Sequence, residues 1–118
     1  MAKGGLFIGW GPAARGREQM ALALFQEVMQ YYARLQQQGE IDSFEPVQLE
    51  PHGGDLQGFV LLRGDTEKLA RLRVSLEFVT LTARATLALD NIGVTGAYFG
   101  EGLEQLFGEY GKLLADLK

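Results

Sequence analysis

The residues best suited to chemistry surround one predicted turn, where the sequence runs Glu50-x-His52-x-x-Asp55. Two carboxylates and an imidazole could hold a hard divalent metal, and the histidine alone could act as an acid or base near neutral pH. A turn that contains the adjacent glycines 53 and 54 holds ligands poorly, and the chain has only one histidine. We therefore expect no metal site, and we keep Glu50 and His52 as candidate ligand-binding residues.

The single tryptophan, Trp10, is the second candidate because it ends a short apolar segment and precedes a glycine. An indole ring offers a large apolar surface and one N–H donor, which suits a flat ligand. The predicted strand order places Trp10, Glu50, His52 and Asn91 at one end of the sheet, and we predict a ligand site there. The alternative is that Trp10 packs in the core against the helices, as large aromatic residues often do.

Residues 9–14, Gly-Trp-Gly-Pro-Ala-Ala, match the dinucleotide pattern G-x-G-x-x-A between a predicted strand and a predicted helix. That pattern binds pyrophosphate through backbone amides at a helix N-terminus. Pro12 removes one of these amides, and no acidic residue ends a second parallel strand about 20 residues later. The segment is better interpreted as a tight turn between strand and helix.

Several other kinds of function are disfavoured by composition. The absence of cysteine excludes a disulfide, a zinc–thiolate site and a thiol nucleophile, and the two serines, Ser43 and Ser75, have no histidine at a useful spacing. The formal net charge of −4 disfavours binding to nucleic acid or anionic lipid. No apolar stretch approaches the ~18 residues of a membrane span, and no signal-peptide core is present. We expect a soluble, cytoplasmic protein that needs no cofactor.

The elements that would position these residues are indicated by the glycines, which are absent from 17–38 and from 65–92. Glycine weakens helix interiors, so both windows are predicted helices, and their apolar residues recur at helical spacing. Gly39 would terminate the first helix, and Asp65 would cap the second. A continuous helix over 66–89 would be ~36 Å long, so we predict a break near 74–77.

Strands are predicted at 6–10, 43–50, 56–63 and 92–99, and a final amphipathic helix at 102–117. Pro46 cannot donate a hydrogen bond to a neighbouring strand, which favours an edge position for its strand. The order strand, helix, strand, strand, helix, strand, helix predicts one α+β domain over 1–118: a ferredoxin-like βαββαβ unit with a C-terminal helix. Its four-stranded antiparallel sheet would carry helices on one face.

This order and length, from Leu6 to Leu117, resemble those of the dimeric α/β-barrel group, in which two ferredoxin-like subunits pack sheet against sheet. The resemblance implies a homodimer with a pocket between the sheet and the helices of each subunit. The group includes cofactor-free oxygenases, heme proteins and proteins of unknown activity, so the resemblance implies no particular reaction. Heme members commonly use a histidine ligand, for which only His52 is available here.

The sequence thus predicts a homodimer whose pocket holds a small apolar or aromatic molecule, for binding or for cofactor-free catalysis. The alternative is a structural or interaction protein whose apolar sheet face serves only dimerisation. Whether the protein is an enzyme is left open. The homodimer follows from apolar residues on both faces of the sheet, since helices would cover only one of them.

Overall fold

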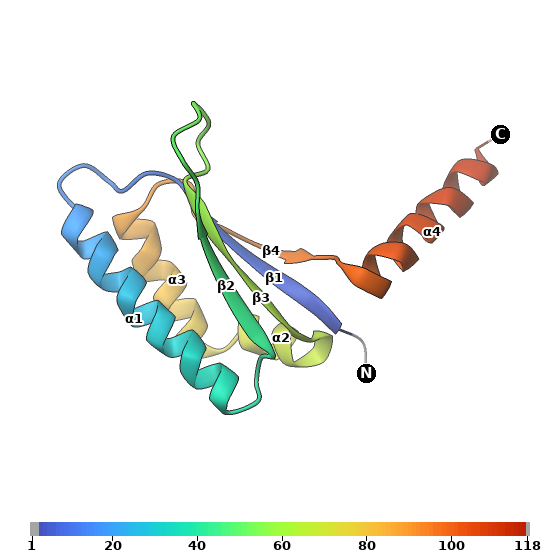
Figure 1. Ribbon diagram of the computed structural model, residues 1–118, viewed down its shortest axis with the longest axis horizontal. Helices are drawn as coiled ribbons and strands as arrows, with labels where there is room; N and C mark the ends of the chain where they lie inside the picture. Colours follow the sequence, from blue (N-terminus) through green and yellow to red (C-terminus); the bar gives the residue numbers. More distant parts are fainter. Residues whose placement is uncertain (1–2, 118) are drawn as a thin grey trace.

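The computed structural model describes residues 3–117 and contains a four-stranded sheet and four helices (Figure 1). The elements are β1 (Lys3–Trp10), α1 (Glu18–Gln37), β2 (Ser43–Gln48), β3 (Gly58–Asp65), α2 (Thr66–Arg73), α3 (Leu76–Ala88), β4 (Gly93–Ala97) and α4 (Gly100–Asp116). The predicted order of elements is confirmed. The predicted helix over 66–89 is divided into α2 and α3, as its length indicated.

The sheet has the strand order β2-β3-β1-β4, and all of its pairings are antiparallel. Phe7 of β1 lies between Leu61 of β3 and Thr95 of β4, which fixes the register across the centre. Helices α1, α2 and α3 lie on one face of this sheet (Figure 1). This is the predicted ferredoxin-like α+β fold. The strand β2, which contains Pro46, lies at an edge as expected.

The helix boundaries follow from local capping. The hydroxyl of Ser75 accepts a hydrogen bond from the Phe78 amide and so caps α3, which begins three residues after the end of α2. The carboxylate of Asp65 accepts a hydrogen bond from the Lys68 amide at 3.2 Å and caps α2, as predicted. At the end of α1, Gly39 has a φ of +75°, a conformation that glycine adopts without strain.

The Asp65 cap leads to a test of local stability. We expect Asp65→Ala to lower the free energy of unfolding by about 1 kcal/mol, because the amide of Lys68 loses its acceptor in a largely buried setting. Asp65→Asn can still cap the helix and should retain most of the stability. Urea denaturation of the three proteins measures the difference. Equal losses in both variants would show that the capping bond is not the stabilising interaction.

The core lies between the sheet and α1, α2 and α3. Leu62 and Val60 of β3 are almost completely buried, and Leu6 of β1 lies beside them. From α1, Leu24 and Tyr32 pack onto this layer. Burial raises the pKa of Tyr32 far above its usual value, so its hydroxyl stays neutral inside the core.

Within residues 3–117, no helix covers the opposite face of the sheet (Figure 1). Phe7 and Phe59 stack at its centre with ring centroids 5.1 Å apart, and Leu61 is the register partner of Phe7. All three side chains are only half-buried. At one end of this face, Arg63 forms an ion pair with Glu45 at 3.2 Å. We call this surface, which comprises Phe7, Val47, Phe59, Leu61 and the Arg63–Glu45 pair, the open sheet face.

Helix α4 projects away from the rest of the chain (Figure 1), and none of its residues is buried. Its projection makes the radius of gyration 16.3 Å, whereas a compact chain of this length has about 13.5 Å. Large apolar side chains of α4 are exposed, including Phe107, Leu113 and Leu114. A single copy of the chain therefore leaves two apolar surfaces uncovered, the open sheet face and the stripe along α4.

Candidate functional site

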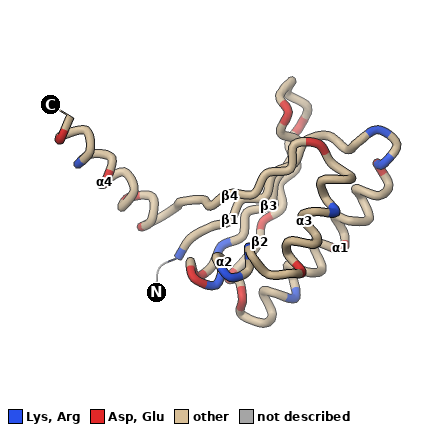
Figure 2. Tube along the Cα trace, turned by 180° about the vertical axis from the view of Figure 1, so that it is seen from behind, with Lys and Arg blue, Asp and Glu red and all other residues tan. Residues whose placement is uncertain are grey.

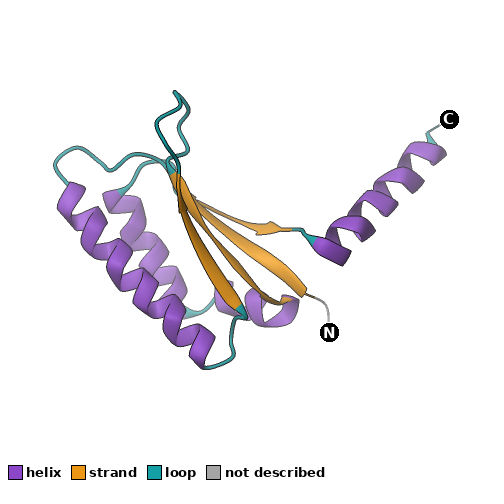
Figure 3. Cartoon of the chain, viewed as in Figure 1, coloured by secondary structure: helices purple, strands orange, loops and turns teal. Residues whose placement is uncertain are grey.

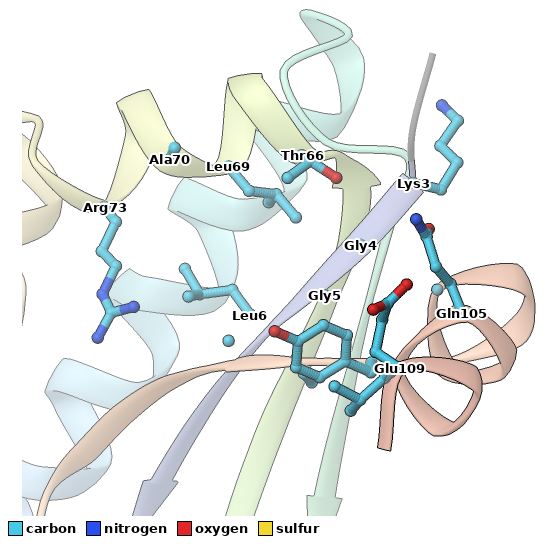
Figure 4. Close-up of a pocket in the computed structure, with 15 residues that line it drawn as sticks. Lys3, Gly4, Gly5, Leu6, Thr66, Leu69, Ala70, Arg73, Gln105 and Glu109 are labelled. Atoms are coloured by element: carbon cyan, nitrogen blue, oxygen red, sulfur yellow. The ribbon is translucent and has the colours of Figure 1, made fainter. Parts of the chain in front are cut away.

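The described chain has a pocket of about 500 Å³ at the end of the sheet where β1 begins and β4 ends (Figure 4). Helix α2 forms one wall, and the first half of α4 forms another. Its small or apolar lining residues are Gly4, Gly5, Leu6, Leu69, Ala70, Gly96, Ala97, Gly102 and Leu106. Its polar lining residues are Lys3, Thr66, Arg73, Tyr98, Gln105 and Glu109.

The pocket exists because the residues on its floor are small. Gly96 of β4 is the register partner of Leu6, and a Cβ at this position would meet no atom within 4 Å. The space above β4 is therefore left open between α2 and α4. The only sequence signal for this pocket is that glycines recur in β1, in β4 and at the start of α4. Glycine spacing alone indicates helix boundaries and turns, and it does not show where a hollow lies.

Charges around the pocket are unevenly arranged. The Lys3 ammonium forms an ion pair with Asp42 at 2.8 Å, and this hydrogen bond raises the pKa of Lys3. The Glu109 carboxylate lies 3.4 Å from the ammonium of Lys112 in the same helix. Arg73 extends from the last turn of α2, and its Nη2 donates to the carbonyl oxygen of Val94 at 2.9 Å. Figure 4 shows Arg73 and Glu109 on opposite sides of the pocket.

The predicted site residues lie at the other end of the sheet, and none of them lines this pocket. Trp10, at the end of β1, is half-buried and packs against the core. Its ring meets that of Phe25 edge-on with centroids 5.9 Å apart, and its Cζ2 lies over Gly58. These contacts favour the alternative interpretation, in which the Trp10 indole packs in the core against the helices.

The structure brings Asn91 near Trp10 but leaves Glu50 and His52 in the loop between β2 and β3. A Cβ at Gly11, next to Trp10, would lie 3.2 Å from the Asn91 side chain. Glu50 and His52 are exposed in the loop, which extends beyond the sheet (Figure 3). His52 Nε2 lies 2.8 Å from the Leu56 carbonyl oxygen, and its Nδ1 accepts from the Gly54 amide. Both imidazole nitrogens thus stabilise the loop, and a ligand role for the four residues stays a prediction.

The segment that matched the dinucleotide pattern is a turn. The Gly11 amide donates to the Asp90 carbonyl at 2.7 Å, and the Ala14 amide donates to the Ala88 carbonyl at 2.8 Å. A phosphate would need these same donors, so the hydrogen bonds favour the structural interpretation. Within residues 3–117, no three acidic or histidine side chains gather as a metal site. In the same part of the chain, no helix is long and apolar enough to cross a membrane.

Comparisons with known proteins identify the fold. No protein-family model matches the chain, and no curated protein matches its sequence. A dimeric ferredoxin-like protein of unknown function from Jannaschia sp. superimposes with a TM-score of 0.64 at 14% identity, over 83% of this chain and 100% of that one. A dimeric protein of unknown function and ferredoxin-like fold from Bacteroides fragilis gives 0.60 at 9% identity, over 82% and 96%.

A third similar structure is SnoaB, a cofactor-independent oxygenase from Streptomyces nogalater. It superimposes with a TM-score of 0.53 at 14% identity, over 85% of this chain and 98% of that one. These likenesses confirm the ferredoxin-like fold and the resemblance to the dimeric α/β-barrel group at the level of the fold. At such low identity they carry no residue roles across to this chain.

Proposed function

We propose that the protein binds a small, partly apolar molecule in the pocket between β1, β4, α2 and α4. The observation that carries this proposal is a hollow of about 500 Å³, within the ~300–1,000 Å³ typical of ligand sites. Leu6, Leu69 and Leu106 supply apolar walls, and the polar side chains stand at the margins. This combination suits a ligand that buries an apolar body and keeps its polar groups at the two ends.

We further propose that the protein is a homodimer built through the open sheet face. Phe7, Phe59 and Leu61 form an apolar centre, and the Arg63–Glu45 pair forms a charged rim, which is the usual anatomy of an interface. A two-fold contact covers the same patch on both copies. The dimeric ferredoxin-like proteins of similar structure support this assembly.

The chemistry of the pocket favours binding over catalysis. Its described lining supplies hydroxyl, amide, carboxylate and cationic groups, but no imidazole. SnoaB is a cofactor-independent oxygenase, so a fold of this kind is compatible with cofactor-free chemistry as well. The remaining alternative is an interaction protein that uses the open sheet face only for dimerisation. This alternative predicts that no ligand binds in the pocket.

Filling the pocket tests the proposed function. The probe is N-phenyl-1-naphthylamine, a neutral aromatic molecule whose fluorescence rises in apolar surroundings. We expect saturable binding to the intact protein and at least tenfold weaker binding to Gly96→Leu, because the new side chain would occupy the hollow. Thr95→Leu adds a similar side chain to the same strand on the opposite face and is the matched control.

A second variant distinguishes the pocket from the predicted site at the other end of the sheet. Trp10→Phe preserves most of the core contact and changes the indole that would stack on a ligand there. If the pocket is the site, Trp10→Phe should bind the probe with unchanged affinity. Loss of binding in Trp10→Phe, with normal binding in Gly96→Leu, would place the ligand beside Trp10 and contradict the proposal.

A further inference from the structure

Within the described chain, the pocket contains a cation that no acidic side chain neutralises. Among residues 3–117, Arg34, Arg63 and Arg84 each pair with a glutamate. Arg73 instead donates to a neutral acceptor, the carbonyl oxygen of Val94, and no ion pair joins it to an acid in this part of the chain. A carbonyl oxygen accepts a hydrogen bond but leaves the charge of the guanidinium unbalanced.

Arg73 also has a particular position. It lines the candidate pocket and also a second hollow of about 300 Å³ beside α3 and β4. Arg73 is exposed, and its bond to Val94 places the guanidinium against β4, where it lines both hollows. The guanidinium has five N–H donors, of which this bond uses one. A ligand in either hollow would therefore come within reach of a held cation.

The other charged side chains of the pocket are each close to a group of opposite charge. Lys3 is neutralised by Asp42, and Glu109 lies on the opposite side of the pocket from Arg73 (Figure 4). The walls between them are supplied by Leu6, Leu69 and Ala97. Along the backbone trace, both α2 and α4 carry basic and acidic residues (Figure 2). Glu109 is itself paired with Lys112. The pocket therefore has one positive end without an acidic partner, at Arg73 of α2, and an apolar middle.

We infer that the ligand is an amphipathic anion, with an apolar or aromatic body and a carboxylate, sulfonate or phosphate group bound by Arg73. Planar guanidinium groups bind such oxyanions through paired, charge-assisted hydrogen bonds. The inference deepens the proposed function and rests on the same pocket. Positive charge in the last turn of a helix is also favourable by itself. Arg71 also lies in the last turn of α2 but does not line the pocket. A variant at Arg71 therefore distinguishes stabilisation of the helix end from binding of an anion.

The test compares two fluorescent probes with the same aromatic body. 1-Anilinonaphthalene-8-sulfonate carries an anionic group, and N-phenyl-1-naphthylamine lacks it. We expect the sulfonate to bind at least tenfold more tightly than the neutral probe. Arg73→Gln should weaken binding of the sulfonate at least tenfold more than binding of the neutral probe, so that the preference is abolished. Arg73→Lys should retain much of the preference because it keeps the charge, and Arg71→Gln should retain all of it.

Two results would overturn the inference in different ways. Equal affinities for both probes, or a preference that survives Arg73→Gln, would show that the pocket does not select an anion although it binds apolar molecules. Binding of neither probe would overturn the proposed pocket together with this inference. Because the sulfonate also binds exposed apolar surfaces, Gly96→Leu must abolish the Arg73-dependent part of its signal. Melting temperatures of all variants verify that each one is folded.

Discussion

Replacement of Leu61 by glutamate should convert a dimer into a monomer of 13.0 kDa. Leu61 lies at the centre of the open sheet face, as the register partner of Phe7 and of Glu45. In a two-fold contact, each copy would bury a new carboxylate against the apolar patch of the other, beside the carboxylate of Glu45. Burying an unpaired charge costs several kcal/mol, so we expect the dissociation constant to rise by at least about 1,000-fold, or ~4 kcal/mol.

Light scattering across a micromolar concentration series measures this change. Leu22→Glu is the control, because Leu22 of α1 is 60% exposed and belongs to no proposed contact. Leu22→Glu should leave the mass unchanged. A mass near 13.0 kDa for the unaltered protein would contradict the homodimer directly. In that case another part of the same chain would have to cover the open sheet face.

The second large effect concerns the neighbouring residue. Leu62→Ala should lower the free energy of unfolding by about 2–5 kcal/mol, because Leu62 is completely buried between the sheet and the helices and its truncation leaves a cavity. This loss should not depend on protein concentration, since the core belongs to each subunit. Urea denaturation at two protein concentrations measures it.

Leu61→Ala is a matched control because consecutive strand residues point to opposite faces. Its side chain is only half-buried in one copy, so the effect within a subunit should be small. Most of its effect should appear through the dimer and should grow weaker as protein concentration increases. If Leu61→Ala destabilised the protein as much as Leu62→Ala at every concentration, the open sheet face would be a part of the subunit core.

The architecture is largely predictable because its determinants are local. Ser75 and Asp65 are side chains of types that begin helices, and both do so here. Pro46 restricts its strand to an edge through the chemistry of one residue. The succession of Leu61 and Leu62 in one strand already indicates two apolar faces. Each of these signals depends on a residue and its immediate neighbours.

The pocket is not predictable in the same way, because it depends on elements far apart in the sequence. Its floor is formed by β1 and β4, and its walls by α2 and α4. The amphipathic pattern of α4 specifies an apolar stripe but does not specify which surface the stripe faces. Sequence reasoning favours Trp10 and His52 because of their chemical character. The candidate pocket instead combines small residues with an arginine whose sequence pattern is typical of a solvated helix face.

Because no residue of α4 is buried, this wall of the pocket is held less firmly than the walls formed by the other elements. Helix α2 and the central strands are fixed by the core, whereas α4 has four glycines, two of them (Gly108 and Gly111) in its second half, and no buried residue. Glycines lower helix propensity, so an isolated helix with this many of them is marginally stable in water. Local opening of α4 therefore requires far less free energy than opening of the sheet. A molecule or a partner that contacts the apolar stripe of α4 would order the helix as it binds. Part of the binding free energy would be used for that ordering, so the affinity would be lower than for a rigid pocket. In return, the α4 wall could adapt its position to ligands of different shape.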